Sequence, residues 1–243
     1  MPGSAPNSGM LLRKLGRLAD RHWRSVLWLR LRPPPGLFQP VGDTLADRYP
    51  VLFRIVHDTI GDGPDRALLS FGCSTGEEIW SLRQVFPQAR LRGLDINATS
   101  IALAEAARHR RGDDGVSFAT AASAVAEPVG RFDAVFAMAV FRHGLLGGGP
   151  PRCDRYLRFD AFERTVTTLA QRIRPGGLLI IRHANFRFED TAASAAFDCM
   201  LRQPYRARTP VYGRDNRRLA ETGEEGVIFL RHVAGDAANR DDL

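Results

Sequence analysis

Residues 70–78 read SFGCSTGEE and join a short apolar run, residues 67–71, to a segment with helical periodicity, residues 77–86. Small residues let a backbone approach a ligand closely, and the first turn of a helix presents N–H groups that have no partner within the helix. The order of strand, small-residue loop and helix therefore predicts a ligand-binding loop at the carboxyl end of a strand in an α/β sheet.

Strand and helix signals alternate along the rest of the chain. We expect further strands at residues 91–94, 116–119, 132–138, 178–181 and 226–230. We expect helices at residues 50–60, at 101–107 after a cap at Thr99 or Ser100, at 159–174 and at 192–201. Regular alternation with short loops predicts a doubly wound, mostly parallel sheet with helices on both faces, a Rossmann-like α/β fold.

The composition fits one globular domain. The chain has 243 residues, of which 44% are hydrophobic and 25% charged. Its apolar runs are far shorter than the roughly 20 residues that span a bilayer, which excludes an integral membrane protein. Three widely spaced cysteines favour neither a disulfide framework nor a zinc site. We therefore expect a cytoplasmic protein without a metal centre.

The positive charge is concentrated near the amino terminus. The chain carries a net charge of +7, and residues 11–32 alone carry +6. We divide the chain into a basic, partly helical arm at residues 1–42, a domain at 43–234 and a flexible tail at 235–243. A basic amphipathic helix can dock on a membrane surface, a partner protein or its own domain. Nucleic acid is not favoured as a partner, because the remainder of the chain is nearly neutral.

The loop after the first strand is more compatible with S-adenosylmethionine (SAM) than with a dinucleotide. The dinucleotide fingerprint requires glycine at positions 72, 74 and 77, where this chain has Gly72, Ser74 and Glu77. A carboxylate there would face the pyrophosphate, whereas SAM has no phosphate and carries two positive groups. A carboxylate from either Glu77 or Glu78 would attract those positive groups. Asp95, at the tip of the second strand, is placed to accept hydrogen bonds from ribose hydroxyls.

Residues 72–78 and 94–97, together with the turn at 174–177, resemble motif I and the neighbouring acidic loop of class I SAM-dependent methyltransferases. The motif I stretch is most similar to that of the chemotaxis receptor-glutamate methyltransferases, and the similarity covers about residues 65–183. The resemblance implies SAM as the cofactor and methyl transfer as the reaction. The cofactor residues that it implies are Gly72, Cys73, Ser74, Gly76, Glu77, Asp95, Ile96, Ala121, Ala122 and Met138.

The chain departs from the receptor methyltransferases in ways that leave the acceptor open. Residues 138–143 read MAVFRH, where that family has an Arg-Asn segment, and the basic arm is much smaller than the family's helical amino-terminal domain. The third strand also lacks the aspartate that many class I enzymes place near the adenine amine. We expect a methyl acceptor that is either a small molecule or a protein side chain.

Two histidines are candidates for a general base. His183 comes directly after the fifth strand, and His143 lies in the loop at residues 142–155. An imidazole titrates near neutral pH and can accept a proton from an amine or hydroxyl acceptor. His183 has a second interpretation, as a hydrogen-bonded residue that closes the strand. Arg182 and Arg187 are either ligands for an acidic acceptor or solvated side chains.

A serine hydrolase is the alternative enzyme class. Residues 72–76 also satisfy G-x-S-x-G, with Ser74 as the nucleophile and Asp133 and His232 as partners in the correct chain order. The order of elements disfavours it, because a nucleophile elbow normally follows several strands and this one follows the first. Asp133 also begins a strand, at the end far from the loop. A protein that binds nucleic acid through the basic arm is a further alternative.

Overall fold

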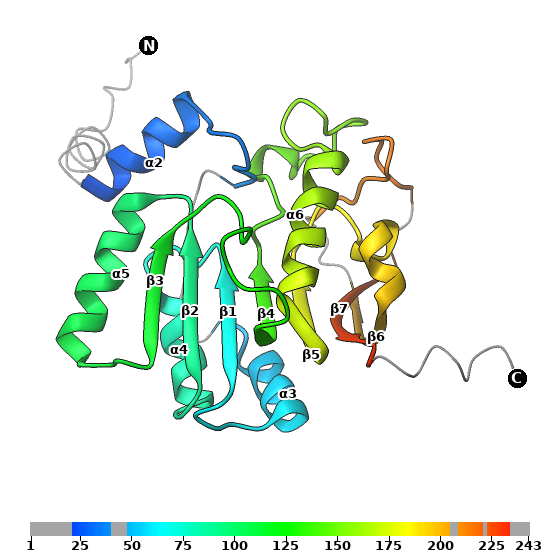
Figure 1. Ribbon diagram of the computed structural model, residues 1–243. Helices are drawn as coiled ribbons and strands as arrows, with labels where there is room; N and C mark the ends of the chain where they lie inside the picture. The colour runs from blue at the N-terminus through cyan, green and yellow to red at the C-terminus, as the bar shows by residue number, and fades with distance from the viewer. Residues whose placement is uncertain (1–20, 40–47, 205–208, 221–222, 234–243) are drawn as a thin grey trace, which may run out of the picture.

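The computed structural model describes residues 21–39, 48–204, 209–220 and 223–233. They form a seven-stranded sheet in the order β3-β2-β1-β4-β5-β7-β6, flanked by helices (Figure 1). The strands are β1 (Ala67–Phe71), β2 (Arg90–Asp95), β3 (Val116–Thr120), β4 (Phe132–Met138), β5 (Ile173–Arg182), β6 (Phe197–Pro204) and β7 (Glu224–Arg231). The predicted doubly wound α/β fold is confirmed.

The direction of the strands sets the position of the site. The pairs β1–β2, β1–β4, β2–β3 and β4–β5 are parallel, and β7 is antiparallel to both β5 and β6. The chain builds outward from β1 to β3 and then returns to place β4 on the other side of β1. Strand order thus reverses between β1 and β4, and in open α/β sheets ligands bind beyond the carboxyl ends of the strands at such a point.

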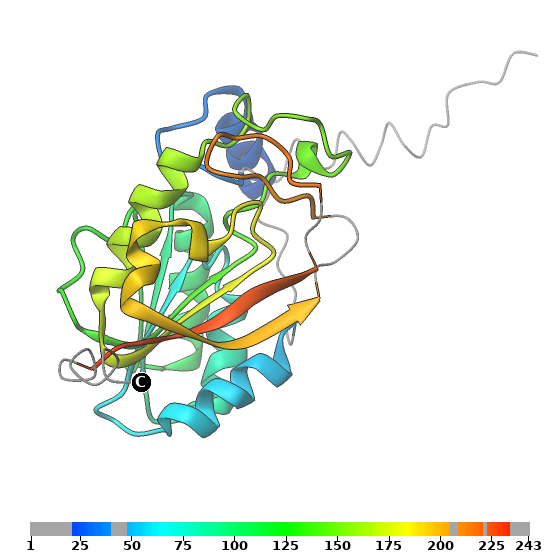
Figure 2. The same ribbon diagram turned by 90° about the vertical axis from the view of Figure 1, so that its right-hand side faces the viewer.

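Helices cover both faces of the sheet. The helices are α2 (Arg21–Leu31), α3 (Pro50–Ile60), α4 (Glu77–Val85), α5 (Ala98–Arg111) and α6 (Phe159–Arg172), with short 3₁₀ turns η1 (Gly144–Leu146), η2 (Phe188–Asp190) and η3 (Ala192–Ala196). Buried side chains of α3, α4 and α5 share one hydrophobic cluster, whereas those of α6 and of residues 184–197 belong to another. Figure 2 shows α6 and α3 on opposite sides of the sheet. The two clusters are the two faces of the sheet, each closed by its own helices.

Two predictions of secondary structure are wrong. Residues 192–201 are not a helix: η3 is followed by β6, which pairs with β7 along its whole length. Met200, within this range, is 47% exposed. The cap of α5 is neither Thr99 nor Ser100 but Asn97, whose side-chain oxygen accepts hydrogen bonds from both of their backbone N–H groups. An asparagine in this position satisfies two donors that the helix itself leaves free.

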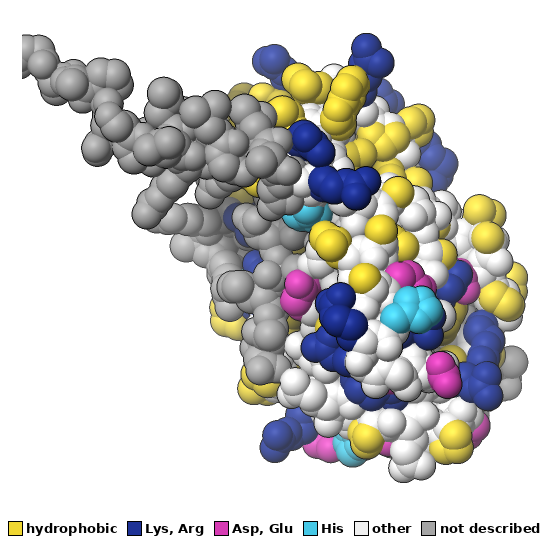
Figure 3. All heavy atoms as spheres, turned by 90° about the vertical axis from the view of Figure 1, so that its left-hand side faces the viewer, with side chains coloured by type: hydrophobic (Ala, Val, Ile, Leu, Met, Phe, Trp, Pro, Cys, Tyr) yellow, Lys and Arg dark blue, Asp and Glu magenta, His cyan; other side chains and the backbone are white. Residues whose placement is uncertain are grey.

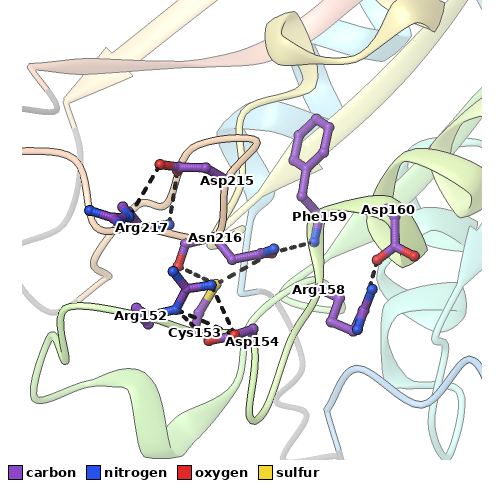
Figure 4. Close-up of polar contacts among 9 residues, drawn as sticks. All are labelled: Arg152, Cys153, Asp154, Arg158, Phe159, Asp160, Asp215, Asn216 and Arg217. Atoms are coloured by element: carbon purple, nitrogen blue, oxygen red, sulfur yellow. Dashed lines mark hydrogen bonds and ion pairs between the residues drawn. The ribbon is translucent and has the colours of Figure 1, made fainter.

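Asn216 joins three segments on the α6 side of the sheet. Its side-chain oxygen accepts the N–H of Phe159 at 2.7 Å, at the first turn of α6, and its backbone oxygen accepts the N–H of Cys153 at 3.0 Å (Figure 4). The residue adopts φ +62°, a conformation that asparagine tolerates better than most side chains. This arrangement holds the loop at residues 147–158 against the start of α6 and the turn at 213–217.

Several expectations fall outside the described residues. These are the start of the basic arm up to residue 20, the boundary expected at residues 42–43 and the tail from residue 235. Within the described ranges, no helix is both long and apolar enough to cross a membrane.

Candidate functional site

A cavity of about 480 Å³ lies at the point where strand order reverses. Its walls come from residues 71–74 after β1, 95–97 after β2, 121–122 after β3 and 138–140 at the end of β4. Residues of α2 and of the segments at 36–39 and 48–53 complete it. The volume falls within the range of roughly 300–1,000 Å³ that is typical of small-molecule sites.

The loop after β1 is held close to both neighbouring strands. The N–H groups of Gly72 and Cys73 donate to the carbonyl oxygen of Leu94 at 2.7 and 3.0 Å. Gly72 adopts φ +78°, and a Cβ there would lie 2.4 Å from Cγ2 of Val140, the residue that faces it from the end of β4. Glycine is required at this position, both for its backbone conformation and for the close approach of the two strand ends.

Unusual backbone conformations gather at the carboxyl ends of the central strands. Ser74 after β1, Ala139 after β4 and His183 after β5 are three of the four non-glycine residues with positive φ among those that the structure describes, at +51°, +60° and +58°. Such conformations cost free energy and persist where the surrounding structure enforces them, commonly at functional sites. Ser74 and Ala139 line the cavity.

Asp95 is fixed at the tip of β2 by backbone donors. Its two carboxylate oxygens accept the N–H groups of Ser74 and Asn97, each at 2.8 Å. Burial raises the pKa of Asp95, and the two N–H donors oppose that effect. Each oxygen keeps a second lone pair, so the carboxylate can accept two further hydrogen bonds from a ligand in the cavity.

The acidic residue of α4 that lines the cavity is Glu78, whereas Glu77 does not line it. The Glu78 carboxylate accepts the hydroxyl of Ser70 at 2.8 Å, and the Glu77 carboxylate accepts the hydroxyl of Thr75 at 2.7 Å. Burial raises the pKa of Glu78 to about 7, against the hydrogen bond from Ser70 and the positive charge of Arg48. Helical spacing does not indicate this choice, because Ser81, which lines the same cavity, lies three residues after Glu78 and four after Glu77.

The described part of the basic arm belongs to the site. Helix α2 lies above the carboxyl ends of the strands (Figure 1), and its residues His22, Val26, Leu29 and Arg30 line the cavity. The side-chain amide of Asn97 donates to the Ser25 hydroxyl at 2.9 Å, which ties α2 to the start of α5. Of the docking modes expected for the arm, α2 shows contact with its own domain. On the face that carries α2 and α5, arginines are dispersed among other side chains (Figure 3).

The two candidate bases lie outside the lining of the cavity. The ring of His183, which is 3% exposed, packs against that of Tyr49 with 5.8 Å between centroids. His143 stacks on Tyr156 at 5.0 Å, and its Nδ1 accepts the N–H of Leu145 at 3.3 Å. Burial lowers the pKa of His143, and the charge of Arg30 lowers it further. The ring is therefore neutral at pH 7, with its proton on Nε2 while Nδ1 accepts.

The residues of the hydrolase alternative do not meet. Asp133 lies at the start of β4 and is bound by Arg66, Arg174 and the N–H of Ala67. His232 follows the end of β7, which is antiparallel to β5, and pairs with Asp198 at 3.3 Å. Both residues lie at the edge of the sheet opposite to Ser74, so Ser74 cannot form a triad with them.

The structure brings together eight of the ten residues expected to hold the cofactor. Gly76 and Glu77 are absent from the lining; a Cβ on Gly76 would instead contact Phe118 at 3.2 Å. Arg182, a candidate for binding an acidic acceptor, is buried and paired with Glu225. The sequence leaves Glu77 and Glu78 as alternatives, and the residues that sequence reasoning missed are Phe38, Arg48, Tyr49 and the α2 side chains.

A family model matches the central part of the chain, which includes the loop after β1. Residues 69–179 match the family model described as a methyltransferase domain. The matched segment runs from β1 into β5 and contains the loop after β1 and Asp95. This segment is similar to methyltransferase domains, which use SAM as their cofactor. No curated protein matches the chain.

Solved structures with a similar fold are distant. Geranyl diphosphate C-methyltransferase from Streptomyces coelicolor A3(2) is 18% identical, with a TM-score of 0.39 over 54% of this chain and 42% of the other. Phosphoethanolamine N-methyltransferase 2 from Haemonchus contortus is 18% identical, with a TM-score of 0.39 over 54% and 27%. The cyclase SpnF is 19% identical, with a TM-score of 0.47 over 66% and 62%. The chain thus spans less than half the length of the two methyltransferases.

Proposed function

We propose that this chain binds SAM in the cavity between β1, β2 and β4 and transfers its methyl group to an acceptor that enters beside α2. The observation that carries the proposal is the convergence of Asp95, Glu78 and the open backbone of residues 72–74 on one cavity at the reversal of strand order. The resemblance of the motif I stretch to receptor-glutamate methyltransferases concerns the cofactor loop and does not identify the acceptor.

The donors and acceptors of the cavity fit SAM. Asp95 would accept the ribose hydroxyls, and Ile96, Ala121 and Ala122 supply apolar surface beside it for the adenine ring. Glu78 would face the positively charged methionyl group, and Arg48, whose charge acts on Glu78, is placed to attract its carboxylate. The short approach between Gly72 and Val140 leaves no room for a side chain at the loop, so the backbone itself forms that wall.

SAM, when bound, supplies a methyl carbon activated by the positive sulfur. The chain's own contribution is alignment of the acceptor and exclusion of water. Met138, Ala139 and Val140 form the wall at the end of β4, and Phe38 and Tyr49 add aromatic surface to the lining. We assign no proton transfer to His143 or His183, because neither side chain lines the cavity.

Calorimetric titration of the full chain with SAM and, separately, with NAD tests this proposal. We expect SAM to bind and NAD not to bind, because the carboxylates of residues 77 and 78 oppose a pyrophosphate at the start of α4. Tight binding of NAD without binding of SAM would contradict the proposal. Labelling with an active-site serine probe provides a second arm, since modification of Ser74 would favour the hydrolase.

A further inference from the structure

The charged residues of the cavity are arranged asymmetrically. The two carboxylates, Asp95 and Glu78, lie at the ends of β2 and at the start of α4, where they meet N–H and O–H donors. The carboxyl-terminal half of α2 and the residues after β4 contribute two cations to the lining, Arg30 and Arg142. Among the described lining residues, these two segments contribute no carboxylate.

Arg30 and Arg142 differ from many of the arginines in this chain. Arg66, Arg83 and Arg92, for example, each pair with a carboxylate at 2.8–3.0 Å. Within the part of the chain that the structure describes, neither Arg30 nor Arg142 forms an ion pair or a side-chain hydrogen bond. Two guanidinium groups that line one cavity without a carboxylate partner make its potential more positive, and a bound anion would offset that charge.

The segment that carries Arg142 is held in place by its neighbours. The N–H of His143 donates to the side-chain oxygen of Asn185 at 2.9 Å, and the His143 ring stacks on Tyr156. The charge of Arg30 reaches this segment, since it lowers the pKa of His143. Arg30 of α2 therefore lies within electrostatic reach of the segment that carries Arg142.

Apolar side chains surround the two arginines. Val26 and Leu29 of α2 line the cavity on the same helix as Arg30, and Leu37 and Phe38 follow in the segment after it. Phe38 is buried and packs edge-on against Phe141, the neighbour of Arg142, with 5.0 Å between ring centroids. An acceptor that met only the arginines would leave this apolar surface uncovered.

We propose that Arg30 and Arg142 form an anion-binding subsite and that the methyl acceptor is an organic anion, a carboxylate or a phosphate, carried on an apolar body. This inference rests on the proposed function, because it assigns the acceptor to the part of the cavity that bound SAM does not fill. A guanidinium group binds either oxyanion with two parallel N–H donors, so both sources fit the same pair. The apolar residues of α2 and the segment at 37–38 bind the body of the acceptor.

Calorimetry on the full chain saturated with S-adenosylhomocysteine (SAH), the demethylated cofactor, tests the inference with four probes that share one apolar tail. Octanoate and octyl phosphate are the anions, octanamide is the neutral analogue and octylamine is the cation. At least one anion should bind about tenfold or more tightly than octanamide and octylamine, because the charged hydrogen bonds are made only to an anion. The anion that binds more tightly shows whether the acceptor carries a carboxylate or a phosphate.

Variants then locate the subsite. Arg142→Gln and Arg30→Gln should each weaken binding of the preferred anion about tenfold, and Arg142→Lys should restore part of the loss. Arg24→Gln is the matched control, because Arg24 is exposed on the same helix and does not line the cavity. An unchanged far-UV circular dichroism spectrum and thermal midpoint in each variant show that its fold is retained.

Three results would overturn the inference: equal binding of the four probes, no binding of any probe, or anion binding that survives both substitutions. The titrations are repeated without SAH. Failure of SAH itself to bind would refute the proposed function, while the probe series would still decide whether Arg30 and Arg142 bind an anion.

Discussion

Replacing Glu78 with glutamine removes the ionisable group of α4 from the cavity wall and keeps an oxygen that can accept the hydroxyl of Ser70. Burial raises the pKa of Glu78 from 4.5 to about 7. Because the folded chain then holds the proton more tightly than the unfolded chain, ionisation of Glu78 opposes folding. The wild type should lose stability as the pH rises from about 4.5 to about 7, by up to about 3 kcal/mol at about 1.4 kcal/mol per pH unit.

Denaturant unfolding of the ligand-free protein between pH 5 and pH 8 measures this effect. The free energy of unfolding of Glu78→Gln should exceed that of the wild type above pH 7, and the difference should narrow below pH 5. Glu77→Gln is the matched control on the next residue of the same helix, because Glu77 bonds to Thr75 and lies outside the cavity lining. Its pH profile should follow that of the wild type.

SAM binding should show the opposite preference. A positively charged ligand favours the ionised Glu78, so wild-type affinity should rise between pH 5.5 and 7.5, where an α-amino group remains largely protonated. Glu78→Gln should remove that rise and weaken SAM binding about tenfold to a hundredfold at pH 7.5, the cost of a charged hydrogen bond. The reasoning fails if Glu77→Gln, and not Glu78→Gln, abolishes the pH dependence.

Four further results are expected. Asp95→Ala should weaken SAM binding by about 1–3 kcal/mol in calorimetry, through loss of charged hydrogen bonds, and an unchanged affinity would remove Asp95 from the site. Gly72→Ala should lower the free energy of unfolding by about 1–3 kcal/mol, and adding Val140→Ala should recover part of it, because the new Cβ would clash at 2.4 Å. Deleting residues 1–35 should reduce SAM affinity at least about tenfold, since α2 forms one wall; a truncation that is folded by circular dichroism and binds SAM normally would contradict this. Asn216→Ala should lower the free energy of unfolding by about 1 kcal/mol or more, through loss of the cap at the start of α6, and an unchanged denaturant midpoint would refute that role.

The sequence predicts the central sheet well because its strands are buried on both faces. Every residue of β1 and β4 is buried, and such strands appear as continuous apolar runs between turn residues. The carboxyl-terminal part of the chain follows a different rule. β6 is an edge strand in which exposed and partly buried residues alternate, and the small residues of η3 just before it, at 192–196, suggest helical periodicity. The conformation of β6 depends on its pairing with β7, which lies further along the chain, and this pairing cannot be read from the local sequence.

The candidate site also has residues that the sequence indicates and residues that it does not indicate. Motif spacing leads to Gly72, Ser74 and Asp95, because these residues follow directly on strands whose ends meet at one edge. It does not distinguish Glu77 from Glu78, since that choice depends on the rotation of α4 about its axis. It also does not indicate that α2 reaches the site, because the contact between Ser25 and Asn97 spans 72 residues of sequence.

A crystal structure of the full chain with SAH tests the central claim most directly. The account predicts SAH in the cavity after β1 and β2, with its ribose hydroxyls on Asp95, its amino group facing Glu78 and α2 covering it. The account is contradicted if SAH occupies another part of the molecule, or if it lies in this cavity with its ribose away from Asp95.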